Sequence, residues 1–300
     1  MEKMIHSPAE IASRYVEAGC KKASLPVRQL LLLGILAGAF IAFASQGSNM
    51  AIHTIESVGL AKALAGAIFS TGLMMVVITG AELFTGNMLI IVSCMEGRSR
   101  WPQMLKNWLF VYIGNLVGSL IVVMLILLSG QLNSSGGLLG GFTIKTAVNK
   151  VNLSFVNAFS MGVLCNWLVC MAVWMAQAAK DMAGKLLAIF FPIWLFITSG
   201  FEHSIANMYY IPAGILAKAN PTWVEAAASM GVTAEKLQAL TWQSFLVKNL
   251  IPVTLGNMLG GGIFVGLIFW RAFLYKKKAT ECDQDQCAIK GVNTNPRSTF

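Results

Sequence analysis

The chain has 300 residues, of which 56% are hydrophobic and 12% charged, and its formal net charge is +9. An ordinary soluble domain carries about 25% charged residues. Several uncharged stretches here reach the length of about 20 residues that a helix needs to cross a bilayer. The sequence therefore predicts an all-α, polytopic membrane protein and excludes an ordinary soluble domain.

The positive charge and the six cysteines do not indicate a nucleic acid or a metal ligand. Lys and Arg lie between the apolar segments and at the ends, without the basic and aromatic stripe typical of nucleic-acid binding. The cysteines follow no metal-ligand spacing, and small buried hydrophobes or reduced thiols are the simpler interpretation. We expect no nucleic-acid partner, no metal and no cofactor.

The first segment, residues 1–28, predicts an amphipathic helix on the cytoplasmic side. Ser7, Pro8 and Glu10 form a capping-box pattern that starts a helix running to about Lys22. We expect this helix to lie along the membrane surface, and a simple soluble helix is the alternative. Because the segment is charged and has no apolar core, a cleaved signal peptide is not expected.

Six hydrophobic segments follow and make a transmembrane domain over residues 29–275. Two of them are interrupted by a polar run, and the pieces on either side are read as half-helices. The segments cover 29–48, 63–81 continuing as 83–95, 108–128, 155–179, 186–200 continuing as 204–217, and 250–270.

The positions of the basic residues predict which side each connection faces. Sixteen of the 22 Lys and Arg lie in the two terminal segments and in the second and fourth connections, which favours a cytoplasmic location for both termini. The tail, residues 276–300, is polar and aperiodic, and we expect it to be disordered in the cytoplasm. The glycine-rich stretch 131–156 predicts a flexible external loop.

The two interruptions share a pattern that indicates an internal repeat. Glu82 and Glu202 are each followed at the same spacing by Asn-Met, and Lys106-Asn107 and Lys248-Asn249 are each followed at the same spacings by Gly-Asn and Gly. Three spans in each half make the second half enter the membrane from the opposite side, which is an inverted repeat. Broken helices at corresponding positions indicate a substrate path between the halves, and half-helix N-termini favour an anion there.

The chain resembles the formate/nitrite transporter family over about residues 7–275. The motifs that carry the resemblance are 81–87 (AELFTGN), 164–170 (LCNWLVC), 199–208 (SGFEHSIANM) and 250–257 (LIPVTLGN). The resemblance implies an aquaporin-like homopentamer in the bacterial inner membrane, with one pore in each protomer. It also implies passage of formate, nitrite or hydrosulfide, often coupled to protons.

The same resemblance implies roles for individual residues. His203 is similar to a single central pore histidine, Thr85 to the threonine facing it, Lys150 to a vestibule lysine and Asn166 to a pore-side asparagine. The residues similar to the apolar rings that pinch the pore are Phe69, Leu73, Leu83, Phe84 and Phe196.

Physical chemistry agrees with these roles, because an apolar ring excludes hydrated ions and an anion between two rings needs a donor or a proton. Imidazole supplies either, since its ordinary pKa lies near 6.5. We hypothesise that the anion takes or shares a proton at His203. Formate is the expected anion, with nitrite or hydrosulfide as the alternative. The segment 209–215 favours formate, whereas Glu82 stands where formate channels often carry Asp.

Structural interpretations stand beside the functional ones. A buried histidine is often only a satisfied donor, Lys150 fits an ordinary loop lysine, and Phe or Leu at helical spacing is usually packing. Four polar residues are expected to stabilise the breaks, with the glutamates capping free backbone N–H groups and the asparagines bonding between helices. These four are Glu82, Asn87, Glu202 and Asn207.

Two other classes of function are weaker. A membrane enzyme or electron carrier commonly pairs axial histidines, but His6 and His53 lie outside the spans, so we expect no enzyme. A neutral-solute channel of the aquaporin kind would carry paired Asn-Pro-Ala boxes, whereas Asn87 and Asn207 are each followed by Met.

Overall fold

The computed structural model describes residues 5–275, so the prediction made for the tail, 276–300, lies outside the described residues. Over that range the elements are helices, and six stretches are long and apolar enough to cross a membrane. The predicted all-α architecture with six spans is confirmed. The stretches are α2 (Val27–Ile52), α3 (Val58–Thr79), α5 (Trp101–Leu128), α7 (Phe155–Ala176), α8 (Met182–Ser199) and the continuous Ser244–Phe273, which contains α12 (Ile251–Gly261) and α13 (Ile268–Phe273).

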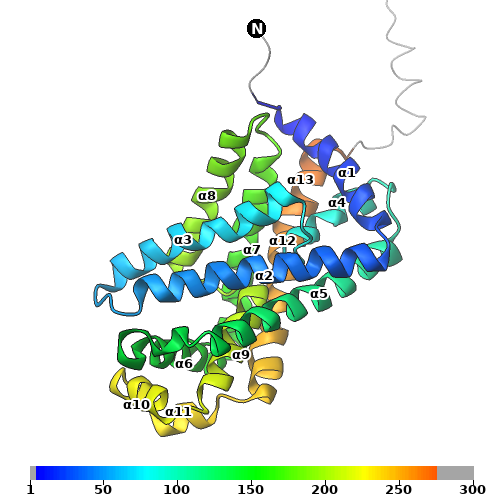
Figure 1. The fold of residues 1–300 in the computed structure, drawn as a ribbon. Helices are drawn as coiled ribbons and strands as arrows, with labels where there is room; N and C mark the ends of the chain where they lie inside the picture. The colour runs from blue at the N-terminus through cyan, green and yellow to red at the C-terminus, as the bar shows by residue number, and fades with distance from the viewer. Residues whose placement is uncertain (1–4, 276–300) are drawn as a thin grey trace, which may run out of the picture.

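Shorter helices connect or extend these spans (Figure 1). In chain order they are α1 (Pro8–Ser24), the 3₁₀ turn Gly86–Leu89, α4 (Ile90–Met95), the 3₁₀ turn Gln131–Gly137, α6 (Leu138–Val151), α9 (Ser204–Ala217), α10 (Pro221–Ser229) and α11 (Ala234–Gln238).

The two halves of the chain use the same helix pairings. α2 packs along α5 in the first half, and α7 packs along α12 in the second. Both pairs approach closely at a glycine. A Cβ on Gly118 would overlap the carbonyl oxygen of Ile35, and a Cβ on Gly260 would overlap that of Val163. Small residues of this kind allow backbones in a membrane to touch, so the glycines repeated in the sequence mark equivalent contacts in an inverted repeat.

The first helix begins as predicted, and one of its faces packs against the rest of the protein. The Glu10 carboxylate accepts from the Ser7 backbone N–H, and the Ser7 hydroxyl accepts from that of Glu10, so the capping box is present. The apolar face of α1, including Ile11, Tyr15 and Val16, is buried against α4, α5 and α13. Protein therefore covers the apolar face of α1, and its position along the membrane surface stays a prediction.

The prediction of a flexible loop over 131–156 is wrong. Most of this stretch forms α6, which packs against α9 and α10. Its glycines serve contact rather than flexibility, since a Cβ on Gly140 would overlap the ring of Trp223. In the sequence, α6 precedes the three spans of the second half, as α1 precedes the three spans of the first half. Each repeat therefore contains four elements, which are one short helix and three spans.

Candidate functional site

Two helices end abruptly at the polar interruptions found in the sequence. α3 ends at Gly80 and α8 at Gly200, with φ values of 73° and 75°. This left-handed conformation favours glycine because it has no Cβ. The chain then runs through 81–85 or 201–203 without helical structure before the next helix begins. Both predicted breaks are present.

One asparagine in each half satisfies the backbone of its break. Asn115 accepts from the backbone N–H of Phe84 at 3.0 Å and donates to the backbone oxygens of Gly34 and Glu82 at 2.8 and 3.0 Å. Asn257 repeats the arrangement: it accepts from Ser204 N–H at 2.9 Å and donates to the carbonyls of residues 162 and 202. Buried backbone polar groups need such partners, because water is absent at membrane depth.

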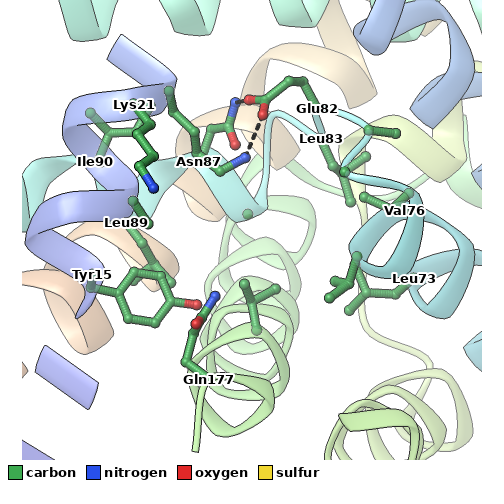
Figure 2. A pocket seen from close by; sticks show the side chains of 18 residues that line it. Tyr15, Lys21, Leu73, Val76, Glu82, Leu83, Asn87, Leu89, Ile90 and Gln177 are labelled. Carbon is green, nitrogen blue, oxygen red and sulfur yellow. Dashed lines mark hydrogen bonds and ion pairs between the residues drawn. The ribbon is translucent and has the colours of Figure 1, made fainter. Parts of the chain in front are cut away.

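The glutamates bind side chains instead of the backbone N–H groups that we expected. In the first half, the Glu82 carboxylate lies 2.6 Å from Lys22 Nζ and accepts a 2.6 Å bond from the Asn87 amide (Figure 2). Asn87 also donates to Asn107 at 2.8 Å, and Asn107 donates to the backbone oxygen of Lys22 at 2.9 Å. These four residues, here called the Lys22 network, join α1, the break and α5.

The second half contains the same arrangement around Lys150. Its Nζ lies 2.7 Å from the Glu202 carboxylate, which accepts a 2.6 Å bond from Asn207. Asn207 donates to Asn249, which donates to the Lys150 carbonyl oxygen. In this Lys150 network the lysine lies in the last turn of α6 and 5.3 Å above the ring of Tyr210. Lys150 is therefore not an ordinary loop lysine.

The two breaks meet through His203 and Thr85. His203 Nε2 lies 3.0 Å from the Thr85 hydroxyl, and both side chains are buried. His203 is also the N-cap of α9, where its Nδ1 accepts a 3.0 Å bond from the backbone N–H of Ala206. Since Nδ1 acts as an acceptor, the neutral ring carries its proton on Nε2 and donates it to Thr85.

Further polar groups surround this contact. Asn166 donates to the carbonyl oxygens of Thr85 and Asn257 at 3.1 and 2.7 Å. Cys170 donates to the same Thr85 oxygen at 3.3 Å. The Asn166 side-chain oxygen and the Ser204 hydroxyl are buried without a partner among the described residues. Unsatisfied buried groups are uncommon and ask for an explanation such as a bound molecule.

The five predicted constriction residues fall into separate groups. Phe69 and Phe196 make an edge-to-face contact at 5.7 Å, and the Phe196 ring lies 6.1 Å from that of His203. Leu73 and Leu83 line a cavity on the α1 side of the break. Phe84 instead packs against Tyr112 and Trp108, and with them lines an apolar groove between α5 and α12.

Sequence reasoning missed some residues of this site. The sequence pattern indicates only that Lys22 is one of the basic residues of the N-terminal segment, whereas in the structure it pairs with Glu82 as Lys150 pairs with Glu202. One sequence signal for the two networks is the repeated Lys-Asn pair near the start of the third and sixth segments. The asparagine of each pair, Asn107 or Asn249, donates to the backbone oxygen of the lysine in its network.

Six membrane-length stretches, together with two breaks that meet at a buried polar contact, define a polytopic transport protein. The chain belongs to the formate/nitrite transporter family, whose model matches residues 9–271. It is 41% identical over 271 residues to the formate channel FocA of Escherichia coli K12, covering 89% of this chain and 94% of that protein. It is 37% identical to a probable formate transporter of Methanothermobacter thermautotrophicus, covering 91% of this chain and 99% of that protein.

Solved structures agree with this assignment. A structure described as a pentameric formate channel with formate bound matches with a TM-score of 0.73 at 37% identity, covering 83% of this chain and 98% of that one. A structure described as an FNT family ion channel matches with a TM-score of 0.73 at 28% identity, covering 88% of this chain and 98% of that one. The similar proteins are named channels or transporters, which points away from an enzyme.

Proposed function

We propose that the chain conducts formate through its own centre and that the contact between Thr85 and His203 is where the anion loses its water. The observation that carries the proposal is this buried 3.0 Å contact between the two breaks. Phe69 and Phe196 bound it on one side, and Leu73 and Leu83 line the cavity beyond the first break on the α1 side. Apolar groups of this kind make a naked anion depend on the donors between them.

The hydrogen bonds favour sharing a proton over giving one away. The Nδ1 of His203 accepts from Ala206 N–H, so the neutral ring holds one proton, on Nε2. Losing that proton would leave an imidazolate, whereas donating it in a hydrogen bond leaves the ring neutral. We therefore infer that formate replaces Thr85 as the acceptor of Nε2–H, while the Thr85 hydroxyl turns to donate to the same anion. At low pH a second proton on Nδ1 would break the bond to Ala206.

The two lysines attract the anion toward this centre. Each is paired with a glutamate, and the Lys150 side chain is only 15% exposed. A partly buried charge is screened less by salt than a fully exposed one. We propose that the Lys22 and Lys150 networks mark the two approaches to the contact between Thr85 and His203.

We also propose a homopentamer in the bacterial inner membrane with both termini in the cytoplasm. The similar solved structure is described as pentameric, and the excess of Lys and Arg at the terminal segments supports the orientation. Leu109, Leu246 and Ile251 are about half exposed on α5 and the sixth span, which suits contact with lipid or another copy.

The experiment that tests this function compares solutes in proteoliposomes. Formate should enter faster than glycerol, and anion-selective currents in planar bilayers should rank formate above nitrite and hydrosulfide. Vesicles that swell in glycerol but not in formate would contradict an anion pathway. A nitrite or hydrosulfide current larger than the formate current would keep the pathway but replace the proposed cargo.

A further inference from the structure

A cavity of about 290 Å³ lies on the α1 side of the first break and is lined by α1, α3, the break, α4 and the end of α7. Figure 2 shows Tyr15 and Lys21 from α1 on one side and Leu73, Val76 and Leu83 on the other. The space is large compared with the roughly 30 Å³ that a water molecule occupies in the liquid. Several waters or a small hydrated ion fit within it.

The hydroxyl of Tyr15 has no hydrogen-bond partner among the described residues, although the side chain is only 5% exposed. The ring is held by stacking on Trp174, with centroids 4.7 Å apart and planes 2° apart. In Figure 2 the phenol oxygen and the side-chain amide of Gln177 both point into the cavity. An orphaned buried hydroxyl costs free energy unless something within the cavity bonds to it.

The charges around the cavity favour an anion as that partner. Lys21, Lys22 and Glu82 line it, and Lys22 is paired with Glu82. Among residues 5–275 no carboxylate forms an ion pair with Lys21, so the lining keeps one net positive charge. Burial raises the pKa of the Tyr15 phenol well above its ordinary value, which keeps it a neutral donor. One uncompensated positive charge and one unused donor suit a monovalent anion.

We propose that this cavity is a second binding site for a small monovalent anion of the transported class, completed by the hydroxyl of Tyr15. The proposal rests on the proposed transport function and adds a waiting position before the first break, separate from the contact between Thr85 and His203. Because Tyr15 belongs to α1, the site forms only while α1 is packed against α4. The anion would reach it from the α1 side and leave it past Leu83.

The test is Tyr15→Phe, which keeps the ring stacked on Trp174 and removes only the hydroxyl. Initial uptake of radiolabelled formate is measured in membrane vesicles sorted by whether the N-terminal segment faces the label. A hydrogen bond to a charged group accounts for about a tenfold change in affinity. We expect the half-saturating formate concentration to rise roughly tenfold when α1 faces the label, with maximal flux unchanged. In vesicles of the opposite orientation we expect no change.

Tyr275→Phe is the matched control, because Tyr275 is exposed and makes an edge-to-face contact with Trp270 outside the cavity. Gln177→Glu is a second variant, which should raise the same concentration by placing a carboxylate at the site. A Tyr15→Phe protein that behaves like wild type, or that changes equally in both orientations, would overturn the site. Wild-type vesicles that pass no formate would instead overturn the transport function itself.

Discussion

Thr85 and His203 lie 3.0 Å apart, although the first ends the break in one half of the chain and the second ends the break in the other. The contact is polar and buried, in a part of the membrane where an unpaired polar group is costly. Each side chain therefore serves as the other's partner until something displaces it. This makes Thr85 the most informative residue to change first.

Thr85→Val keeps the shape of the side chain and removes the hydroxyl. We expect formate flux in proteoliposomes to fall about tenfold or more, because Nε2–H loses its acceptor at rest and the anion loses a donor. Thr143→Val makes the same change at a buried hydroxyl that bonds within α6 to Leu139. That control should keep wild-type flux. Equal flux in both variants would remove Thr85 from the mechanism.

His203→Gln separates sharing a proton from transferring one. Glutamine offers a neutral N–H donor but does not titrate, whereas phenylalanine offers neither. If the proton is shared, we expect His203→Gln to keep conducting formate, because its neutral amide N–H replaces the Nε2–H of His203 as the donor to the anion. His203→Phe should be inactive. A Gln variant as inactive as the Phe variant would favour full proton transfer.

Lys150→Met tests the buried ion pair. Removing one partner of such a pair costs about 3–5 kcal/mol, because the remaining charge stays buried. We expect a clear loss of thermal stability in detergent, partly restored in the double variant Lys150→Met, Glu202→Gln. Lys22→Met should cost less, because the Lys22 side chain is 34% exposed and that of Lys150 15%. A double variant less stable than Lys150→Met would contradict the view that the unpaired Glu202 carboxylate causes the loss of stability.

Gly260→Ala tests the close contact between α7 and α12. A Cβ at this position would overlap the carbonyl oxygen of Val163, so we expect a lower melting temperature and less folded protein by size-exclusion chromatography. Gly262→Ala is the matched control two residues on, because nothing lies within 4 Å of its Cβ position. Equal stability of the two variants would show that α7 and α12 accommodate a Cβ at residue 260 without a loss of folding free energy.

Local signals explain what the sequence predicted well. Apolar length identified the six spans, and the polar runs around Glu82 and Glu202 identified both breaks. Each run follows a glycine, Gly80 or Gly200, in the left-handed conformation that ends a helix. The repeated Gly-Asn spacing also marked Asn115 and Asn257, whose bonds lie next to the backbone that they satisfy.

Contacts between distant residues explain what the sequence did not predict. Lys22 and Glu82 are separated by 60 positions, and nothing in the sequence near Lys22 names its partner. Polarity alone also did not show that Asn115, rather than Glu82, would bond the backbone of the break. A glycine in a glycine-rich stretch, such as Gly140, suggests a flexible position. In the structure Gly140 instead allows the ring of Trp223 to pack closely, and the sequence does not show where that ring lies.

The Lys22 network draws only on the first half of the chain and the Lys150 network only on the second, with no residue in common. Damage to one should therefore leave the other's bonds in place, and the two losses of stability should add. A scaffold duplicated in this way allows one half of the chain to change its polar network in evolution, while the other half and the shared contact between Thr85 and His203 stay as they are.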